Sequence, residues 1–366
     1  MLVWLGMLMS IILFWVLIPD ALGKKKKNQI FLILSCLSIA FVMGSRAPQM
    51  MNSLDLQNYY RMFVMSGQVS MEKLVMKYET IEKGFLLLNK IISYFSPWPY
   101  TFQYVEALFC TSVMFWYINR NTEDVFMGVL IYLCFGPWQF FLTGFRQAFA
   151  ISLCFIALEI LKKHKFTSDV LGVGLILLAT TLHLTAWIFV TIIFLRNLKF
   201  SKKLIVTCAA ITTILFGLLP FILEFGKNVM NKTHTIHYEG NVLGGLIPIC
   251  VYVGTLILVY LIESEEKGYV QSRNPELVIL LVGLCLYTLR YSAIVMERIS
   301  FYFTPVISVV LSDAIVRQKN KVNRNIIYAI VIVLVLMLFA YRAKSQFGNY
   351  VYFWTYEELV DLVYDV

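Results

Sequence analysis

Isolated charged side chains interrupt an otherwise apolar sequence, and they are the residues most able to do chemistry. Arg146 and Gln147 open an apolar stretch that closes on a basic cluster at residues 162–165. A charge at the bilayer midplane costs about 2.5–3.5 kcal/mol on insertion scales, so such groups usually face a cavity or a membrane surface. Guanidinium groups bind phosphate oxygens bidentately and keep their charge. Arg146, together with Arg290 and Arg298, therefore predicts a site for an anionic ligand at one membrane face.

The candidate acid–base residues are His183, Glu82 and Asp55. His183 lies in an apolar stretch, where it could be a general base or only a hydrogen-bonded structural group. Asp55 precedes Tyr59 by one helical turn, and Tyr60 follows. Such aromatic-plus-carboxylate sets suit sugar binding, but an ordinary interfacial helix start has the same pattern. Both interpretations stay open from the residues alone.

A structural role is the alternative for the arginines. Long basic side chains also extend from apolar segments to the interface, or form ion pairs. Glu297 follows Arg290 by seven residues, so the two side chains share a helix face if the helix continues through both. Glu297 could then hold Arg290 in place as a salt-bridge partner.

Cysteine and histidine usage predicts neither a metal nor a cofactor. The seven cysteines all lie inside apolar runs without a CxxC pair, which is typical of buried small hydrophobic residues. His234 and His237 have the spacing of metal ligands, but two histidines in a polar loop are better explained as surface residues. No phosphate-binding loop or zinc-protease motif is present.

Composition places the chain in a membrane. Of its 366 residues 59% are hydrophobic and 14% are charged, and the mean hydropathy is +0.74. These values predict an all-α polytopic integral membrane protein. The net charge of +9 arises from short basic clusters between apolar runs. That distribution is the positive-inside pattern and argues against nucleic acid as a partner.

About 11–12 membrane-crossing helices are predicted, with both termini outside. A retained first span is favoured over a signal peptide because four lysines follow the first apolar run and no basic residue precedes it. Residues 168–196 are interpreted as a short hairpin, 168–182 and 184–196, with His183 at its outer tip. The other predicted spans are 2–18, 29–45, 100–118, 125–142, 146–161, 204–223, 246–262, 276–293, 299–315 and 326–342.

The prediction is a single polytopic domain over residues 1–366. An outer loop at 46–98 contains an amphipathic helix at 78–95, which we expect to lie on the outer leaflet. A second outer loop covers 224–245. The tail at 343–366 is aromatic and then acidic, as expected of an interfacial anchor.

Five short segments give the chain a resemblance to a known family. They are SLDLQNYYRMF (53–63), EKGFLLLNKI (82–91), FRQAFAISL (145–153), LHLTAWI (182–188) and ERISFYF (297–303). In this order and spacing they resemble the EpsG family of bacterial exopolysaccharide proteins, which is grouped with the Wzy-type polysaccharide polymerases. One departure is Thr185-Ala186 after the histidine, where the family pattern has Ser-Ala.

The resemblance implies glycosyl transfer at the outer face of the cytoplasmic (inner) membrane of a bacterium. The donor would be a glycan on undecaprenyl pyrophosphate, the acceptor a lipid-linked repeat unit, and other polysaccharide-assembly proteins possible partners. In that reaction Arg146, Arg290 and Arg298 would stabilise the leaving pyrophosphate, and His183 would be the first candidate base, with Glu82 or Asp55 behind it.

Two other functions are alternatives, and they differ in whether they need these residues. A transporter or flippase for a lipid-linked saccharide would bind its anion through the same arginines. Transporters tend to show internal repeats and binding sites at mid-depth, and neither is visible in this sequence. A membrane scaffold of a polysaccharide machine would need neither Arg146 nor His183.

Overall fold

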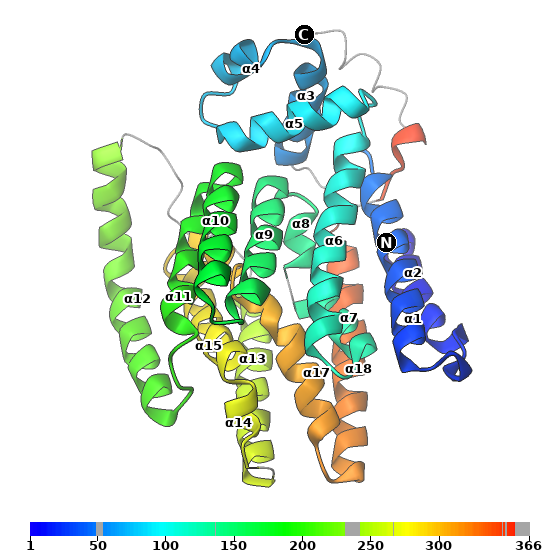
Figure 1. Cartoon of the computed structure of the whole chain (residues 1–366), viewed down its shortest axis with the longest axis vertical. Coiled ribbons are helices and arrows are strands. Elements are labelled where there is room, and N and C mark those ends of the chain that lie inside the picture. Colours follow the sequence, from blue (N-terminus) through cyan, green and yellow to red (C-terminus); the bar gives the residue numbers. More distant parts are fainter. Residues whose placement is uncertain are drawn as a thin grey trace. The chain divides into compact units, whose positions relative to one another are not determined.

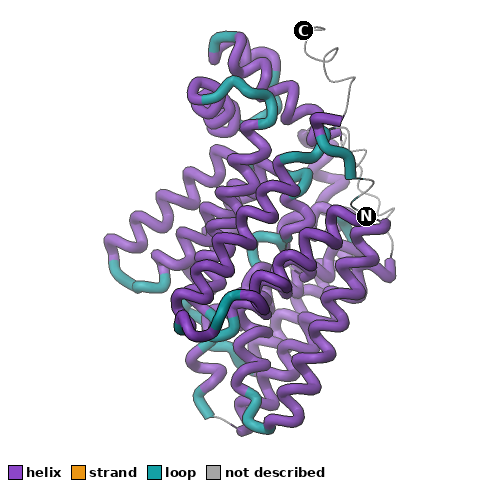
Figure 2. The backbone as a smooth tube through the Cα atoms, turned by 90° about the vertical axis from the view of Figure 1, so that its right-hand side faces the viewer, coloured by secondary structure: helices purple, strands orange, loops and turns teal. Residues whose placement is uncertain are grey.

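The chain is helical over the residues that its structure, a computed structural model, describes (Figures 1 and 2). These are residues 1–48, 54–135, 137–230, 242–265, 267–345, 347 and 350–355. Within them no β-strand occurs, and the β pairing consists of an isolated bridge between Arg46 and Tyr352. The predicted all-α polytopic membrane class is confirmed.

The helices pack into two compact units, each described by itself. The first unit contains residues 1–121, 138–187 and 330–366. Its helices are α1 (Leu2–Leu17), α2 (Lys24–Gly44), α3 (Leu54–Gln68), α4 (Met71–Lys77), α5 (Lys83–Phe95), α6 (Thr101–Asn121), α8 (Trp138–Phe141), α9 (Phe145–Leu161), α10 (Phe166–Leu182) and the second part of α18 (Lys321–Ser345). Short 3₁₀ turns lie at Asp20–Leu22 and Phe353–Thr355.

The second unit contains residues 122–137 and 188–329. Its helices are α7 (Val125–Phe135), α11 (Ile192–Leu195), α12 (Lys202–Met230), α13 (Val242–Glu265), α14 (Tyr269–Ser272), α15 (Asn274–Thr288), α16 (Val295–Ser300), α17 (Ile307–Arg317) and the start of α18. Its 3₁₀ turns are η4 (Leu289–Tyr291) and η5 (Thr304–Val306), while η3 (Leu184–Thr191) begins in the first unit.

Length and apolar composition allow four of the described helices to cross a membrane without help. They are Lys24–Gly44, Lys202–Ile222, Gly245–Ser264 and Lys321–Lys344. Shorter apolar helices such as α1, α7 and α10 need neighbouring helices to shelter their ends. The chain is thus a multi-pass membrane protein, and the number of crossings and the side of each terminus stay predictions.

Several predicted elements are broken where the sequence suggested continuity. The helix expected at 78–95 begins at Lys83, because residues 78–82 form a turn between α4 and α5. The second arm of the hairpin is a 3₁₀ helix followed by the short α11, and 276–293 ends as α15 and η4.

Two further predicted spans and one loop also differ. The span 125–142 divides into α7 and α8, and 299–315 divides into α16, η5 and α17. Part of the loop expected at 224–245 is helical, because α12 continues to Met230 and α13 starts at Val242, and residues 231–241 lie outside the described residues. His234 and His237 lie outside the described residues, as does the acidic end of the tail after Thr355.

Each unit has its own apolar core. In the first, Trp4 and Trp138 are fully buried and meet edge to face, with Phe339 stacked on Trp138. In the second, α7 is buried along its whole length and packs on α17. Aromatic and branched side chains buried at this density make the packing intolerant of added volume.

We predict that Gly44→Ala destabilises the first unit by about 1–3 kcal/mol through overpacking between α2 and α6. A Cβ at residue 44 would overlap the ring of Tyr104. That ring cannot move away freely, because its hydroxyl is hydrogen-bonded to Ser45 at 2.6 Å. The measurement is the unfolding temperature of the purified protein in detergent. Gly6→Ala is the control, since nothing lies within 4 Å of its Cβ position, and equal effects of the two variants would contradict the prediction.

Candidate functional site

The carboxylate of Glu82 is the centre of a polar cluster in the first unit. Arg146 donates from Nη1 to Oε2 at 2.6 Å. His183 Nδ1 lies 3.2 Å from Oε1, and the backbone N–H of Leu184 donates to the same oxygen at 3.0 Å. The cluster therefore joins the start of α5, the start of α9 and the end of α10, which are far apart in the sequence.

Helix ends position all three side chains. Glu82 immediately precedes α5, but its side chain makes no capping bond to that helix and reaches instead to α9 and α10. His183 is the residue after α10, with extended backbone angles of φ −155° and ψ 118°. This break turns the N–H of Leu184 out of the helical pattern and makes it available to Glu82. Figure 1 shows α5 lying across the ends of α6 and α10, which it contacts.

Close backbone packing sets the distance between α5 and α10. Gly84 lies against Thr181, where a Cβ would overlap both the hydroxyl and the carbonyl oxygen of that residue. Only glycine allows the two helix ends to approach this closely. The short contact brings Glu82 within hydrogen-bonding reach of His183.

Tyr59 holds the other edge of Arg146. Its hydroxyl accepts a hydrogen bond from Arg146 Nε at 3.3 Å, and its ring stacks on Phe145 with centroids 5.2 Å apart. Burial raises the pKa of Tyr59 against the opposing influence of Arg146, so the hydroxyl keeps its proton. Two fixed contacts, to Tyr59 and Glu82, thus set the plane of the Arg146 guanidinium.

The environment of Glu82 decides which protons the cluster can move. Burial alone would raise the pKa of Glu82, but the hydrogen bonds from His183 and Leu184 and the charge of Arg146 together lower it to about 2. An ionised carboxylate is an acceptor only, so the His183 nitrogen facing it must be the one that carries a proton. In the neutral ring Nε2 is then the acceptor, which is the arrangement of a positioned general base.

The cluster is partly open. The exposed fractions of the side chains are 24% for Arg146, 18% for Glu82 and 20% for His183. They are desolvated enough for charges to interact strongly, yet a ligand can reach them. The arrangement offers a fixed cation beside a fixed proton acceptor.

Arg46 holds the turn from which Arg146 projects. Its position directly after the predicted span 29–45 did not suggest this role. Its side chain is fully buried and donates to the carbonyl of Leu142, in the turn before α9. Its guanidinium also lies 5.9 Å from the ring centroid of Phe145, which stacks on Tyr59. A buried arginine thus fixes the turn from which Arg146 projects.

Three other residues expected in this site come from α3 and α9. Asp55 is exposed on α3 one turn before Tyr59, and its negative charge is one of the influences that raise the pKa of Tyr59, after burial. Tyr60 is buried against Tyr100, with ring centroids 5.4 Å apart, on a separate aromatic cluster. Gln147 is buried in α9. The role of Asp55 as a base behind His183 stays a prediction, as do the roles of Tyr60 and Gln147 in substrate binding.

Arg290 and Arg298 belong to the second unit. Arg290 donates from Nη1 to Glu297 Oε1 at 2.9 Å and to the hydroxyl of Tyr287. The ion pair forms although the helix breaks between η4 and α16, so the expected partnership holds without the expected continuous helix. Arg298 is exposed on α16. Joint action of these arginines with Arg146 stays a prediction.

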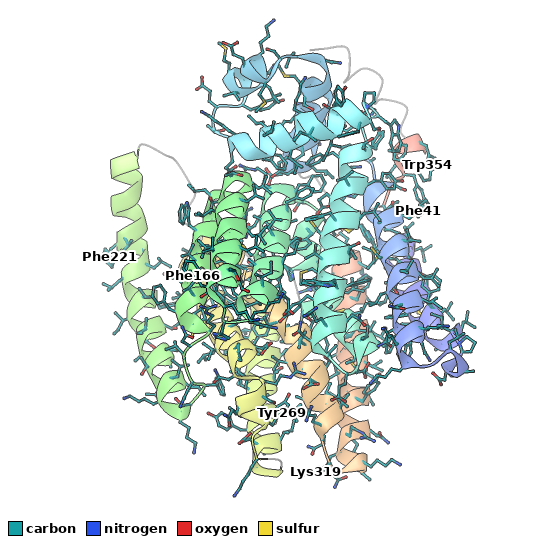
Figure 3. All side chains as sticks on the ribbon, in the orientation of Figure 1. Phe41, Phe166, Phe221, Tyr269, Lys319 and Trp354 are labelled. Carbon is teal, nitrogen blue, oxygen red and sulfur yellow. The ribbon has the colours of Figure 1, made fainter. Side chains whose placement is uncertain are left out.

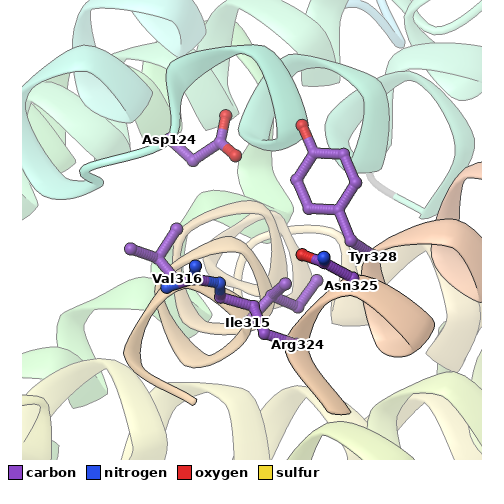
Figure 4. Close-up of a pocket in the computed structure, with 6 residues that line it drawn as sticks. All are labelled: Asp124, Ile315, Val316, Arg324, Asn325 and Tyr328. Carbon is purple, nitrogen blue, oxygen red and sulfur yellow. The ribbon is translucent and has the colours of Figure 1, made fainter. Parts of the chain in front are cut away.

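A cavity of about 300 Å³ lies elsewhere in the second unit (Figure 4). It is lined by Asp124, Ile315, Val316, Arg324, Asn325 and Tyr328. Asp124 is engaged structurally, since it accepts from the N–H of Met127 in the first turn of α7 and bonds to Tyr328. None of the residues expected from the sequence to act in chemistry lines this cavity.

The chain matches one known protein family over most of its length. The EpsG family matches residues 29–357, which is nearly all of the sequence and includes every residue of the Glu82 cluster. The chain belongs to the EpsG family. Neither the curated proteins nor the solved structures contain a match. At a coarse level, EpsG membership associates the chain with polymerase-like function in exopolysaccharide biosynthesis.

In this EpsG-family chain, three of the five segments that carry the resemblance meet in one place. Glu82 comes from EKGFLLLNKI, Arg146 from FRQAFAISL and His183 from LHLTAWI. Tyr59, from SLDLQNYYRMF, contacts Arg146. The sequence indicated these residues separately, but it did not indicate that Glu82 is their common partner, nor that Arg46 and Gly84 position them.

We predict that Glu82→Gln removes a pH-dependent part of the stability. The folded state lowers the pKa of Glu82 from 4.5 to about 2, so its stabilisation is present above the unfolded value. It is then lost as the pH falls through the window from about 5 to about 2. The measurement is the unfolding temperature against pH in detergent. Exposed Glu79 provides the control Glu79→Gln, and a wild-type pH slope in Glu82→Gln would contradict the prediction.

We also predict that Gly84→Ala separates α5 from α10 and so weakens the contact of Glu82 with His183. The variant should lose the acid-dependent stability described above while retaining its carboxylate. Gly67→Ala is the control, because a Cβ there would make an ordinary contact of 3.8 Å with Ser93. The same unfolding measurement applies, and full retention of the pH dependence in Gly84→Ala would show that the close approach is not needed.

Proposed function

We propose that this protein is a polysaccharide polymerase. It transfers a glycan from undecaprenyl pyrophosphate to a lipid-linked repeat unit at the outer face of the cytoplasmic membrane. The observation that carries the proposal is the shared carboxylate of Glu82, which holds a cation, Arg146, and a proton acceptor, His183, within one partly open cluster. Membership of the EpsG family supports the same class of reaction.

The chemistry needs one base and one cation. A hydroxyl oxygen of the acceptor sugar attacks the anomeric carbon of the donor, and the bond from that carbon to the pyrophosphate oxygen breaks. The hydroxyl proton passes to Nε2 of His183, and the bonding electrons leave with the lipid pyrophosphate. Arg146 stabilises the negative charge that develops on the leaving group.

In this proposal Glu82 is a positioning residue. A carboxylate with a pKa of about 2 is a poor proton acceptor for a sugar hydroxyl near neutral pH. Its hydrogen bond orients the His183 ring and stabilises the imidazolium that forms when the proton arrives, as the carboxylate of a Ser-His-Asp triad does. Asp55, which is exposed on α3 and lies near Tyr59, is a weaker candidate for the base than His183, whose ring is oriented by Glu82.

The first experiment is to delete the protein and analyse the glycans on the lipid carrier. Single repeat units accumulating on undecaprenyl pyrophosphate at the outer face are the expected result, since export continues and polymerisation stops. Repeat units held at the inner face would instead identify a flippase and overturn the proposal.

We predict that His183→Ala lowers the polymerisation rate by about 10²–10⁴-fold, the usual contribution of a general base. Arg146→Ala should lower it by about 10²–10³-fold through lost charge stabilisation. Polymer length and yield are measured on gels at matched expression. Exposed His164 and Arg61 provide the controls His164→Ala and Arg61→Ala. If either site variant made polymer of unchanged length and yield, the role assigned to that residue would be wrong, and a scaffold function would be favoured.

A further inference from the structure

Six aromatic side chains from three segments of the first unit form a continuous cluster beside the end of α2. These residues, called here the aromatic cluster, are Phe41, Trp98, Tyr100, Tyr352, Phe353 and Trp354. Trp354 stacks on Tyr352 with centroids 4.4 Å apart, and Phe353 stacks on Tyr100 at 3.9 Å. The sequence suggested an aromatic anchor in the tail alone, without the partners from α2 and from the segment before α6.

The backbone holds the tail in this cluster. Ala47 donates to the carbonyl of Val351 at 2.9 Å, and Phe353 donates to the carbonyl of Ser45 at 3.0 Å. These bonds flank the bridge between Arg46 and Tyr352. The cluster is therefore a fixed part of the unit.

The cluster presents apolar ring surface outward. The exposed fractions are 50% for Phe41, 45% for Trp98 and 55% for Trp354. Figure 3 labels Phe41 and Trp354 close together at the end of α2. Exposed rings in such a group need an apolar or interfacial environment.

The exposed side chains of α2 indicate that lipid covers the aromatic cluster. Along α2, one of the helices able to cross a membrane, the side chains of Ile30, Ile33, Leu37 and Phe41 are exposed at helical spacing. This stripe faces lipid, and its last member, Phe41, is itself part of the aromatic cluster. Trp and Tyr concentrate where such a stripe reaches the headgroups, because their rings are amphipathic.

The exposed side of α5 leads along the chain to Trp98 of the same cluster. Leu87, Ile91, Tyr94 and Phe95 are exposed on that helix, and Trp98 follows its end by three residues. Sugar-binding surfaces rely on aromatic faces, whereas Leu87 and Ile91 offer aliphatic surface suited to acyl chains. A membrane-interface helix combines these residue types.

We propose that the aromatic cluster and the exposed side of α5 dock together into the outer-leaflet interface, with lipid as their occupant. The C-terminal end of α5 is then anchored at headgroup depth, and Glu82 lies at the other end, about 20 Å away for a helix of this length. Resting on the proposed function, this anchor holds the Glu82 cluster at the level where the pyrophosphate of a membrane-embedded lipid lies.

Trp98 and Trp354 provide their own probes of depth. The full-length protein is reconstituted into phosphatidylcholine vesicles, with the acyl chains either unmodified, brominated near the headgroup or brominated near the chain end. The emission of each residue is the difference between wild type and Trp98→Phe or Trp354→Phe. We expect both difference signals to lose most of their intensity with shallow bromine, less with deep bromine, and little with aqueous iodide on both sides of the membrane.

Trp138→Phe is the matched control, since fully buried Trp138 should be quenched by none of these reagents. Quenching of Trp98 and Trp354 by iodide but not by bromolipids would place the cluster in water and overturn the proposal. Protection from iodide by soluble oligosaccharide would identify a glycan platform and also overturn it.

The measurement is independent of catalysis. If bromolipids quench Trp98 and Trp354 but Arg146→Ala makes unchanged polymer, the membrane anchor is supported and the proposed function is contradicted. If iodide quenches them and Arg146→Ala makes no polymer, the anchor is contradicted and the proposed function is supported. The two proposals can therefore fail separately.

Discussion

The ionised carboxylate of Glu82 is the interaction on which the first unit's polar site depends. A carboxylate that is largely removed from water must be matched by donors, and here the donors come from Arg146, His183 and the Leu184 backbone. These donors can reach the carboxylate because α5 begins after Glu82, α9 begins just before Arg146 and α10 ends before His183. One charge thus accounts for three helix ends.

Other carboxylates in the protein show what distinguishes this cluster. Asp313 is fully buried between Arg273, at 2.9 Å, and Arg317, at 3.6 Å. Glu159, 5% exposed, is held by Arg120 and Lys162. Each of these two acids faces two cations, as expected of a structural tie. Glu82 instead faces one permanent cation and one titratable ring, and all three side chains remain about one-fifth exposed. Glu82 therefore joins a fixed cation to a ring with a free acceptor nitrogen, which neither of the other two acids does.

The sequence predicted the helices well and their interruptions poorly. Apolar runs bounded by lysines locate α1, α9 and α18, because burial in lipid depends on composition that can be counted. The turn at 78–82 was missed because Ile81, Phe85 and Leu88 keep helical spacing through it. That turn exists to direct Glu82 to partners 64 and 101 residues away. Candidate residues could likewise be recognised by type, but Arg46 and Gly84 act through backbone contacts that no local pattern records.

In the proposed reaction the net charge of the cluster changes as the proton is transferred. Glu82 and Arg146 carry opposite charges, so with neutral His183 the set is balanced before reaction. When His183 takes the sugar proton, it becomes an imidazolium beside an ionised carboxylate already placed to stabilise it. The site then gains one positive charge as negative charge develops on the leaving pyrophosphate, while Arg146 stays fixed by Tyr59 and Glu82. Stabilisation that appears only as the bond breaks lowers the barrier without tightening the binding of the donor.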